Sequence, residues 1–372
     1  MRTPLKSVFP PVPLGTAEVL TDPARTWQLL LADIASARRE VLLENYILLE
    51  GAASDALLEA LVTAEAAGAR ILVHVDGAGS FLMSGRLRRR LEALGELRVY
   101  HPIQWSALFR GLRERLLRRT HRRILTVDGK VGWTGGLAIE DPWWPVHGLE
   151  PVRETMIRVA GAPAAQLREA FLQLWESRHP KPVHVRIPRD GEALVAPHYA
   201  LRARRPARYL QRLIGEARQR VWLGTAYFVP PRPILRLLYR TAERGVDVRL
   251  MLPGLAGHDH PIVRAAAHRY YGRLLAKGIR VYEYQPAFYH AKCGLIDDRD
   301  VMVGTWNLDR WSFLSNHEIA VFARDAQCAM SLEAQFENDF ARSTEFTHEA
   351  WQARPLHDRV TERFSGLFAR WM

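Results

Sequence analysis

Buried strands and amphipathic helices alternate along the chain, and their order in the first half recurs in the second. Each half runs from a helix end into an apolar strand, continues with an amphipathic helix that ends near a glycine and feeds another strand, and closes with a third helix and strand. This alternation is typical of α/β units with largely parallel strands covered on both faces. The corresponding segments are 37–43 and 217–223, 57–77 and 234–254, and 95–102 and 278–284.

The repeat divides the chain into two domains. We expect one over residues 1–178 and the other over 207–372, each an α/β unit with a mostly parallel sheet flanked by helices. The stretch 179–206 is rich in proline, arginine and histidine without clear periodicity, which predicts a linker. Residues 103–120 form an insertion that the second half lacks. Its leucines, aromatic residues and arginines favour an interfacial amphipathic helix, and a solvated helix packed on its domain is the alternative.

A short motif occurs once in each half. His121, Arg123 and Asp128 have the same spacing as His290, Lys292 and Asp297. If each motif starts on a strand, the histidine and the cation two residues later project from one face, and the aspartate has the opposite parity. The histidine and the cation are then expected to meet substrate, and Asp128 and Asp297 are expected to be structural.

The motif residues match the needs of phosphodiester chemistry. Such a reaction requires a nucleophile, a proton donor for the leaving oxygen, and positive charge beside the phosphoryl oxygens. Two histidines can divide the first two tasks, and the two cations remove the need for a metal. We therefore expect one site built from both halves, with no metal and no cofactor. His258, Asp259 and His260 are metal-ligating types, but we expect loop residues there.

Composition narrows the partners. The chain has 372 residues, 48% of them hydrophobic, and a formal charge of +12, which points to a polyanion such as an anionic membrane surface or a nucleic acid. Only Cys293 and Cys328 are present, which argues against a disulfide framework and favours buried core thiols. The sequence shows neither a secretory signal nor an uncharged stretch of 18 residues, so we expect a soluble or peripheral protein on the cytoplasmic side.

The paired motifs resemble those of the phospholipase D superfamily, and their context resembles the shorter bacterial cardiolipin synthases without transmembrane helices. This resemblance covers nearly the whole chain and implies two tandem phospholipase D-like domains, related by a pseudo-two-fold axis, with one site at their interface. It also implies phospholipid substrates, namely the anionic phosphatidylglycerol and, as an alternative donor, phosphatidylethanolamine, and a peripheral location on the cytoplasmic face of the bacterial cell membrane. No obligate protein partner is implied. The segments that carry the resemblance are 40–47, 74–80, 121–136, 153–171, 226–254 and 278–318.

Residue by residue, the resemblance implies that His121 is the nucleophile and His290 the general acid and base, although the near-symmetry leaves these roles open to exchange. The carboxylates of Glu154 and Glu318 would each accept a hydrogen bond from one histidine. Such a bond to one imidazole nitrogen fixes the tautomer and raises the basicity of the other nitrogen. The remaining implied roles are phosphate binding by Lys292, Arg123 and Asn307, structural support by Asp128 and Asp297, and shaping of the turn under the site by Gly304 and Thr305.

The first motif departs from the family pattern. Arg123 replaces the usual lysine, Ala138 stands where Asn307 lies in the second half, and Glu154 is one methylene longer than the usual aspartate. We predict a cardiolipin synthase-like phosphatidyltransferase that works through a phosphohistidine. The alternatives are a hydrolase of the same fold that uses water, a phosphodiesterase that acts on nucleic acid, and a non-catalytic protein that binds anionic lipid. Of the two polyanionic partners, the sequence favours phospholipid over nucleic acid. Aromatic residues at 141–145 either line an entrance or pack as a loop.

Overall fold

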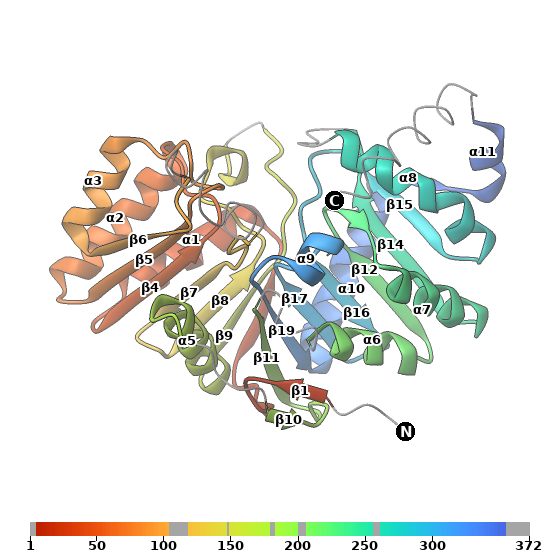
Figure 1. Cartoon of the computed structure of the whole chain (residues 1–372), viewed down its shortest axis with the longest axis horizontal. Coiled ribbons are helices and arrows are strands. Elements are labelled where there is room, and N and C mark those ends of the chain that lie inside the picture. The colour runs from red at the N-terminus through yellow and green to blue at the C-terminus, as the bar shows by residue number, and fades with distance from the viewer. Residues whose placement is uncertain are drawn as a thin grey trace, which may run out of the picture.

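The computed structural model describes residues 5–103, 118–146, 149–178, 183–199, 206–255 and 261–354. Two halves lie side by side, and each contains a large β-sheet with helices against it (Figure 1). The α/β class and the tandem arrangement expected from the repeat are confirmed.

The first half is built on a seven-stranded sheet. Successive side chains of a strand point to opposite faces of this sheet, and both faces are apolar. Val41 and Leu43 belong to the core under helices α1, α2 and α3, whereas Leu42 belongs to the core under α5. The strands, in spatial order, are β3 (Ala17–Leu20), β9 (Met156–Ala160), β8 (Val131–Gly135), β7 (Ile124–Val127), β4 (Glu40–Asn45), β5 (Arg70–Asp76) and β6 (Glu96–Tyr100), and the helices are α1 (Pro23–Ala35), α2 (Ala52–Ala66), α3 (Gly85–Leu94) and α5 (Ala162–Trp175), with the short 3₁₀ helix η2 (Asp141–Trp143).

The second half is built on a nine-stranded sheet. Helices α6, α7 and α8 cover the face that carries Leu223 and Leu250, and α10 covers the face that carries Trp222. The strands, in spatial order, are β2 (Val12–Pro13), β11 (Glu192–His198), β19 (Glu318–Arg324), β17 (Asp300–Gly304), β16 (Cys293–Ile296), β12 (Arg220–Gly224), β14 (Asp247–Pro253), β15 (Arg280–Tyr284) and β20 (Ser343–Phe346), and the helices are α6 (Pro206–Glu216), α7 (Arg232–Glu243), α8 (Pro261–Ala276), α9 (Arg310–Leu314), α10 (Ala326–Ala341) and α11 (His348–Ala353).

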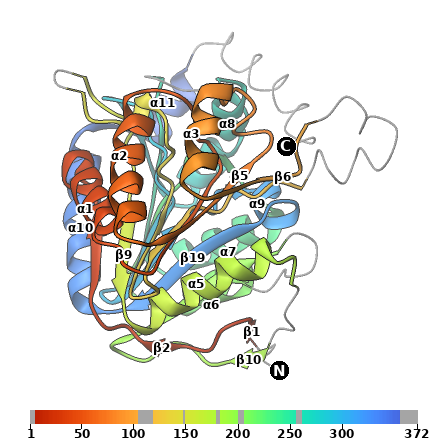
Figure 2. The same ribbon diagram turned by 90° about the vertical axis from the view of Figure 1, so that its left-hand side faces the viewer.

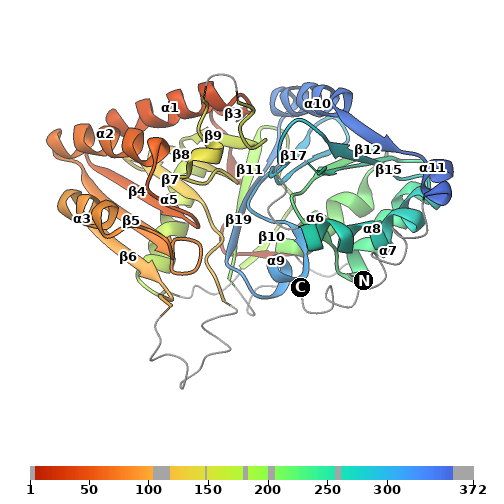
Figure 3. The ribbon, with the colours of Figure 1, turned by 90° about the horizontal axis from the view of Figure 1, so that it is seen from above.

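Two small ladders complete the structure: β1 (Leu5–Ser7) pairs with β10 (Val183–Val185), and β13 (Phe228–Val229) pairs with β18 (Leu308–Asp309). Between the large sheets, one hydrophobic core contains residues of α5 from the first half together with residues of β17, β19 and α10 from the second. Figures 2 and 3 place α1 and α10 on the same outer side of the molecule. The two halves therefore share buried apolar surface. Cys293 and Cys328 are both buried within this core, as expected of core thiols.

The expectation of mostly parallel sheets is wrong. Parallel pairing is confined to β4, β5 and β6 in the first sheet and to β12, β14 and β15 in the second, and every other pair in these two sheets is antiparallel. The reason lies in the connections. A turn of three residues, 128–130, joins β7 to β8, and the equivalent turn at 297–299 joins β16 to β17. So short a connection can join only antiparallel neighbours.

The expectation that 179–206 is an irregular linker is also wrong for part of that stretch. Strand β11 pairs with β19 along its whole length and with β2 on its other side. Six of its seven residues are buried, so the strand lacks the alternation of buried and exposed positions that would have indicated it. The domain boundaries at residues 178 and 207 remain a prediction.

Strand register brings both motifs to equivalent edges. His121 lies just before β7, which is antiparallel to β4, so this histidine lies beyond the carboxyl end of β4. His290 lies just before β16, which is antiparallel to β12, and therefore lies beyond the carboxyl end of β12. We call this part of the molecule, where the carboxyl ends of β4–β6, β12 and β14 lie, the site edge.

Candidate active site

Backbone hydrogen bonds join each motif to the opposite half. The His121 amide donates to the carbonyl of His317 at 2.9 Å, and the His290 amide donates to the carbonyl of Arg153 at 2.9 Å. Both contacts belong to isolated parallel bridges, Thr120 with His317 and Arg153 with Tyr289. Each motif histidine is thus fixed beside the segment that leads into the glutamate of the other half.

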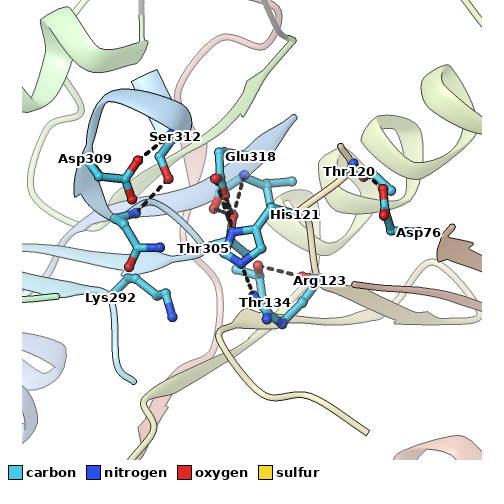
Figure 4. Close-up of polar contacts among 12 residues, drawn as sticks. Asp76, Thr120, His121, Arg123, Thr134, Lys292, Thr305, Asp309, Ser312 and Glu318 are labelled. Atoms are coloured by element: carbon cyan, nitrogen blue, oxygen red, sulfur yellow. Dashed lines mark hydrogen bonds and ion pairs between the residues drawn. The ribbon is translucent and has the colours of Figure 1, made fainter. Parts of the chain in front are cut away.

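The histidine and glutamate side chains pair in the same crossed manner. His121 Nδ1 lies 3.1 Å from both carboxylate oxygens of Glu318 (Figure 4), and His290 Nδ1 lies 2.6 Å from Glu154 Oε2. A carboxylate that accepts Nδ1–H fixes the tautomer and leaves Nε2 as the reactive nitrogen. The sequence placed two glutamates behind two histidines, and the structure shows that neither half holds a complete pair.

The motif cations lie beside the reactive nitrogens. Lys292 Nζ lies 2.7 Å from His290 Nε2, and Arg123 Nη1 lies 3.3 Å from His121 Nε2. Both cationic side chains are buried, and the spacing of two residues puts each on the side of its histidine, as the parity of a strand predicts. Two buried positive charges next to two imidazoles form a place where a phosphodiester anion can bind.

Burial dominates the protonation of the site. It lowers the pKa of His290 well below its usual range, and Lys292 and Arg123 lower this pKa further. Burial also lowers the pKa of His121, while the nearby carboxylate of Glu318 opposes this change. Burial raises the pKa of Glu154 to about 7. Both imidazoles are therefore neutral near pH 7 before substrate arrives, with Nε2 unprotonated.

The turns under the two glutamates differ. Thr305 Oγ1 donates to Glu318 Oε2, and Gly304 lies where a Cβ would come within 2.3 Å of the Ile319 carbonyl oxygen. In the first half the position of Thr305 is taken by Gly136, where a Cβ would come within 2.3 Å of the Glu154 carboxylate. Glu154 therefore lies against the backbone of Gly136, and its carboxylate has no counterpart of the Thr305 hydroxyl at that position.

Asn307 lies in a buried polar cluster that sequence reasoning only partly identified. Its backbone N–H donates to Ser312 Oγ at 3.3 Å, and Asp309 caps helix α9 by accepting from the Ser312 backbone N–H at 2.8 Å. Burial raises the pKa of Asp309 to about 7. Ala138, the counterpart of Asn307, is fully buried in the core of the first half, so that half contributes no amide there. Asp309 and Ser312 lie two and five residues after Asn307 in the chain, and this proximity is the signal that would have identified them.

Aromatic rings flank both histidines, and sequence reasoning missed most of them. The ring of Tyr46 meets that of His121 edge to face at 5.1 Å between centroids, and Trp143 meets His290 in the same way at 5.3 Å. Phe288 lies 5.6 Å from His290. Trp143 is also 8% exposed, so the aromatic loop at 141–145 is both packed and part of the site. Both imidazoles are buried beside these rings, with His121 8% and His290 4% exposed.

A buried ion pair holds the first motif in place. Arg122 Nε donates to Glu44 Oε2 at 3.1 Å, and Thr120 Oγ1 donates to Glu44 Oε1 at 2.5 Å. All three side chains are fully buried. The equivalent positions of the second half hold Gly224, Ala291 and Tyr289, and the tyrosine hydroxyl occupies the space that a Cβ on Gly224 would need.

The motif aspartates lie in the turns, away from the imidazoles, as their parity predicts. Asp128 has φ of 54° and accepts hydrogen bonds from the backbone amides of Arg39 at 2.8 Å and Glu40 at 3.0 Å. Asp297 has φ of 53° and accepts from Gln219 at 2.8 Å in the same arrangement. Each aspartate thus ties its motif hairpin to the start of the neighbouring strand.

This arrangement predicts a stability effect without a direct catalytic one. Asp128→Ala should lower the free energy of unfolding by about 1–3 kcal/mol, because several backbone amides lose their acceptor and alanine is strained at positive φ. Asp128→Asn should cost less, since asparagine tolerates this φ and keeps one acceptor oxygen. Urea denaturation measures both values. Equal losses for the two variants would contradict the role assigned to the side-chain oxygen.

Some predicted features lie outside the described residues, namely most of the insertion at 103–120 and the loop residues 258–260. Within the part of the chain that the structure describes, there is no group of three or more histidine, cysteine or acidic side chains that could hold a metal ion. The described helices also include none that is both long enough and apolar enough to cross a bilayer.

Comparison with known proteins identifies similar sequences over most of the chain. The family described as "Cardiolipin synthase, PLD-like domain" matches residues 210–340. The major cardiolipin synthase ClsA of Bacillus subtilis (strain 168) is 30% identical over 370 residues, which cover 95% of this chain and 75% of that protein. Cardiolipin synthase A of Pseudomonas entomophila (strain L48) is 31% identical over 341 residues, covering 89% of this chain and 70% of that protein.

Similar folds occur among solved structures. The phosphatidylserine synthase of Haemophilus influenzae Rd KW20 superposes with a TM-score of 0.73 at 13% identity, covering 99% of this chain and 95% of that one. The polyphosphate kinase of Porphyromonas gingivalis superposes with a TM-score of 0.61 at 14% identity, covering 96% of this chain and 54% of that one. At these identities the superpositions establish a shared fold.

Proposed function

Because the chain belongs to the phospholipase D-like cardiolipin synthase family, we propose that it transfers a phosphatidyl group from a donor phospholipid to a hydroxyl of phosphatidylglycerol. The observation that carries the proposal is the crossed arrangement of His121 with Glu318 and His290 with Glu154 around buried cations. Two imidazoles, each held through Nδ1 and with its Nε2 beside a cation, provide a nucleophile and a proton carrier at one phosphodiester.

The reaction proceeds in two displacements. In the first, His121 Nε2 attacks phosphorus, the bond from phosphorus to the headgroup oxygen breaks, and His290 gives a proton to the departing alcohol. In the second, a phosphatidylglycerol hydroxyl gives its proton to His290 and attacks phosphorus, and the bond from phosphorus to His121 breaks. Glycerol is released if the donor is phosphatidylglycerol, and ethanolamine if it is phosphatidylethanolamine. Lys292, Arg123 and Asn307 bind the phosphoryl oxygens.

The contacts of the two imidazoles support this division of roles. Arg123 is 3.3 Å from His121 Nε2, a weaker contact than the 2.7 Å between Lys292 and His290 Nε2, so the lone pair of His121 is more available. The pseudo-two-fold symmetry makes the exchanged assignment the alternative. Trapping the intermediate from a labelled donor and mapping the labelled peptide distinguishes the two, because the peptides around His121 and His290 differ.

Substrate binding is expected to raise the pKa of His290. Lys292 and Arg123 both lower this pKa, and a phosphodiester anion between them offsets their charge. A general acid must be protonated, so activity falls as pH rises through its pKa. Because kcat/KM reports the free enzyme and kcat reports the complex, the alkaline limb of kcat should lie at least about one pH unit above that of kcat/KM. Rate profiles on phosphatidylglycerol measure both limbs, and coincident limbs would contradict the role given to His290.

The substrates and the basic composition also support a location. We place the protein at the cytoplasmic face of the bacterial cell membrane as a peripheral protein whose partners are anionic phospholipids. A charge of +12 favours attraction to such a surface. This placement needs neither a nucleic acid nor a second protein.

Product analysis tests the function. Purified protein is incubated with phosphatidylglycerol vesicles, with and without phosphatidylethanolamine and a chelator, and separately with single-stranded DNA. The proposal expects cardiolipin in the presence of chelator. Phosphatidic acid alone would identify a hydrolase, DNA cleavage without lipid turnover would identify a nuclease, and vesicle binding without turnover would identify a lipid-binding protein. Each of the last three results contradicts the proposal.

A further inference from the structure

Exposed apolar side chains are concentrated at the site edge. Nine large apolar side chains are exposed in the described part of the chain, and six of them lie in loops that leave or enter this edge. Register places each loop: Asp76 pairs with Tyr100 and Gly224 with Met251, so the residues that follow β5, β6 and β14 emerge there. Gly135 pairs with Met156, so the loop between β8 and β9 starts and ends there. The six residues are Phe81, Leu82, Ile103, Val146, Leu149 and Leu255.

The most exposed adjacent pair belongs to a loop that is firmly held. Phe81 is 61% exposed and Leu82 is 77% exposed. Asp76 Oδ1 accepts from the Ala78 amide at 2.7 Å, and Ser80 Oγ donates to the Tyr46 carbonyl at 3.0 Å. Because these bonds fix the loop, the two apolar side chains are held in solvent by the fold, and burying them elsewhere requires a partner.

The same loop lies close to the chemistry. Ser80 Oγ also accepts from the Leu48 amide at 3.1 Å, and Tyr46, whose carbonyl Ser80 binds, packs its ring against His121. Figure 3 places the end of β6 and helix α9, which follows Asn307, along one margin of the molecule. Ser80 and Tyr46 therefore link the apolar tip of the loop to the imidazole of His121 through direct contacts.

The charge beside the loop is positive. Helix α3 begins three residues after Leu82 and carries Arg86, Arg88, Arg89 and Arg90. Three of them form ion pairs, Arg86 with Glu50 at 3.8 Å, Arg88 with Glu92 at 3.9 Å and Arg90 with Asp55 at 2.5 Å, which leaves an excess of one positive charge. Arg86, Arg88 and Arg89 are exposed. An apolar tip that is followed by clustered arginines suits the interface of an anionic bilayer, where the tip enters the acyl region and the arginines meet the headgroups.

We propose that the Phe81–Leu82 loop, followed by the arginines of α3, docks the protein on an anionic phospholipid bilayer with the site edge facing the membrane. This inference rests on the proposed function, because a phosphatidyl donor and acceptor both reside in that bilayer. Docking in this orientation brings the headgroups to the histidines without extraction of the whole lipid into water.

The test compares two pairs of exposed apolar residues. The docking variant is Phe81→Ser/Leu82→Ser. The matched control is Val62→Ser/Met330→Ser, which removes side chains that are 50% and 62% exposed on helices α2 and α10, outside the site-edge loops. Binding to sedimented vesicles of phosphatidylglycerol and phosphatidylcholine is measured together with turnover of a short-chain phosphatidylglycerol dissolved below its micelle concentration. Thermal unfolding checks that each variant folds.

The proposal expects the docking variant to bind vesicles at least about tenfold more weakly than wild type while it keeps most of its turnover of dissolved lipid. The control variant should match wild type in both assays. Unchanged vesicle binding by the docking variant would overturn the proposal, and so would an equal loss in the control. Loss of dissolved-lipid turnover in the docking variant would also overturn it, because the loop would then support the site through Tyr46.

The charge contribution has its own comparison. Arg88→Glu/Arg89→Glu should weaken binding to vesicles that contain phosphatidylglycerol and leave binding to pure phosphatidylcholine unchanged. Equal binding to the anionic vesicles would overturn the part assigned to α3. If the wild-type protein binds vesicles through this loop but forms no product from either lipid, the proposed function fails and the docking surface stands.

Discussion

His290→Ala is expected to lower the rate of cardiolipin formation by at least about 10³-fold, and His121→Ala by a similar factor. Each substitution removes one of the two imidazoles at the shared site, and the remaining imidazole cannot both attack phosphorus and carry the proton. The double variant should be no worse than the slower single variant by more than about tenfold, because residues that act as one unit give strongly non-additive losses. Initial rates on phosphatidylglycerol vesicles measure all three effects.

His184→Ala is the matched control for this prediction. His184 is an exposed histidine on β10, and its loss should leave the rate unchanged. Circular dichroism and urea denaturation verify that the active-site variants remain folded. Losses that multiply in the double variant would contradict a single site, and a rate near that of wild type in either single variant would contradict the two-histidine mechanism.

Arg122→Ala is expected to lower the free energy of unfolding by about 3–5 kcal/mol, because it leaves the fully buried Glu44 carboxylate without its cation. Removal of the cation also leaves unpaired the carboxylate that binds Thr120, the residue next to His121, so activity should fall as well. Urea denaturation measures the stability. The exposed pair of Arg70 and Glu96 supplies the control, since Arg70→Ala should leave the free energy of unfolding nearly unchanged.

A paired replacement separates the buried charge from packing. Glu44→Leu/Arg122→Met removes both charges and retains most of the volume, so it should cost less than Arg122→Ala alone. A double variant that is less stable than the single one would show that the ion pair itself, and not the unpaired charge, determines the loss. An Arg122→Ala variant as stable as Arg70→Ala would contradict the assignment of a buried pair.

Sequence reasoning predicted the α/β class, the tandem repeat and the residues that meet at the site. The spacing of His290 and Lys292 was sufficient to place both on one face, because the parity of a strand is a local property. The crossed pairing of His121 with Glu318 was not predictable in this way. It depends on how the two halves pack, and no local spacing encodes the distance between residues that lie 197 positions apart.

The misses have similar physical causes. Buried strand β11 shows no alternation, so its proline and histidine content suggested a linker. The mostly parallel sheets were inferred from the alternation of strands and helices, although the three-residue turns at 128–130 and 297–299 already required antiparallel neighbours. Glu44 and Arg122 are charged residues in apolar surroundings, and a sequence does not show whether such residues find each other. Tyr46 has no feature in the sequence that separates it from an ordinary packed aromatic residue, and only the distance of its ring from His121 identifies it. For Trp143 the sequence left an entrance and a packed loop open, and its distance from His290 decides that it belongs to the site.

The central claim is that the crossed site holds a phosphatidyl group on a histidine during transfer, and trapping this adduct tests it most directly. Wild-type protein is mixed with acyl-labelled phosphatidylglycerol, quenched by denaturation at alkaline pH, and analysed for label bound to the chain and to its peptides. The account predicts covalent label that is lost in mild acid, lies on the peptide containing His121, and is absent from His121→Ala. Two results would contradict it. One is wild-type protein that forms cardiolipin at the full rate but never carries label. The other is His121→Ala that carries as much label as wild type, on a peptide that contains neither position 121 nor His290.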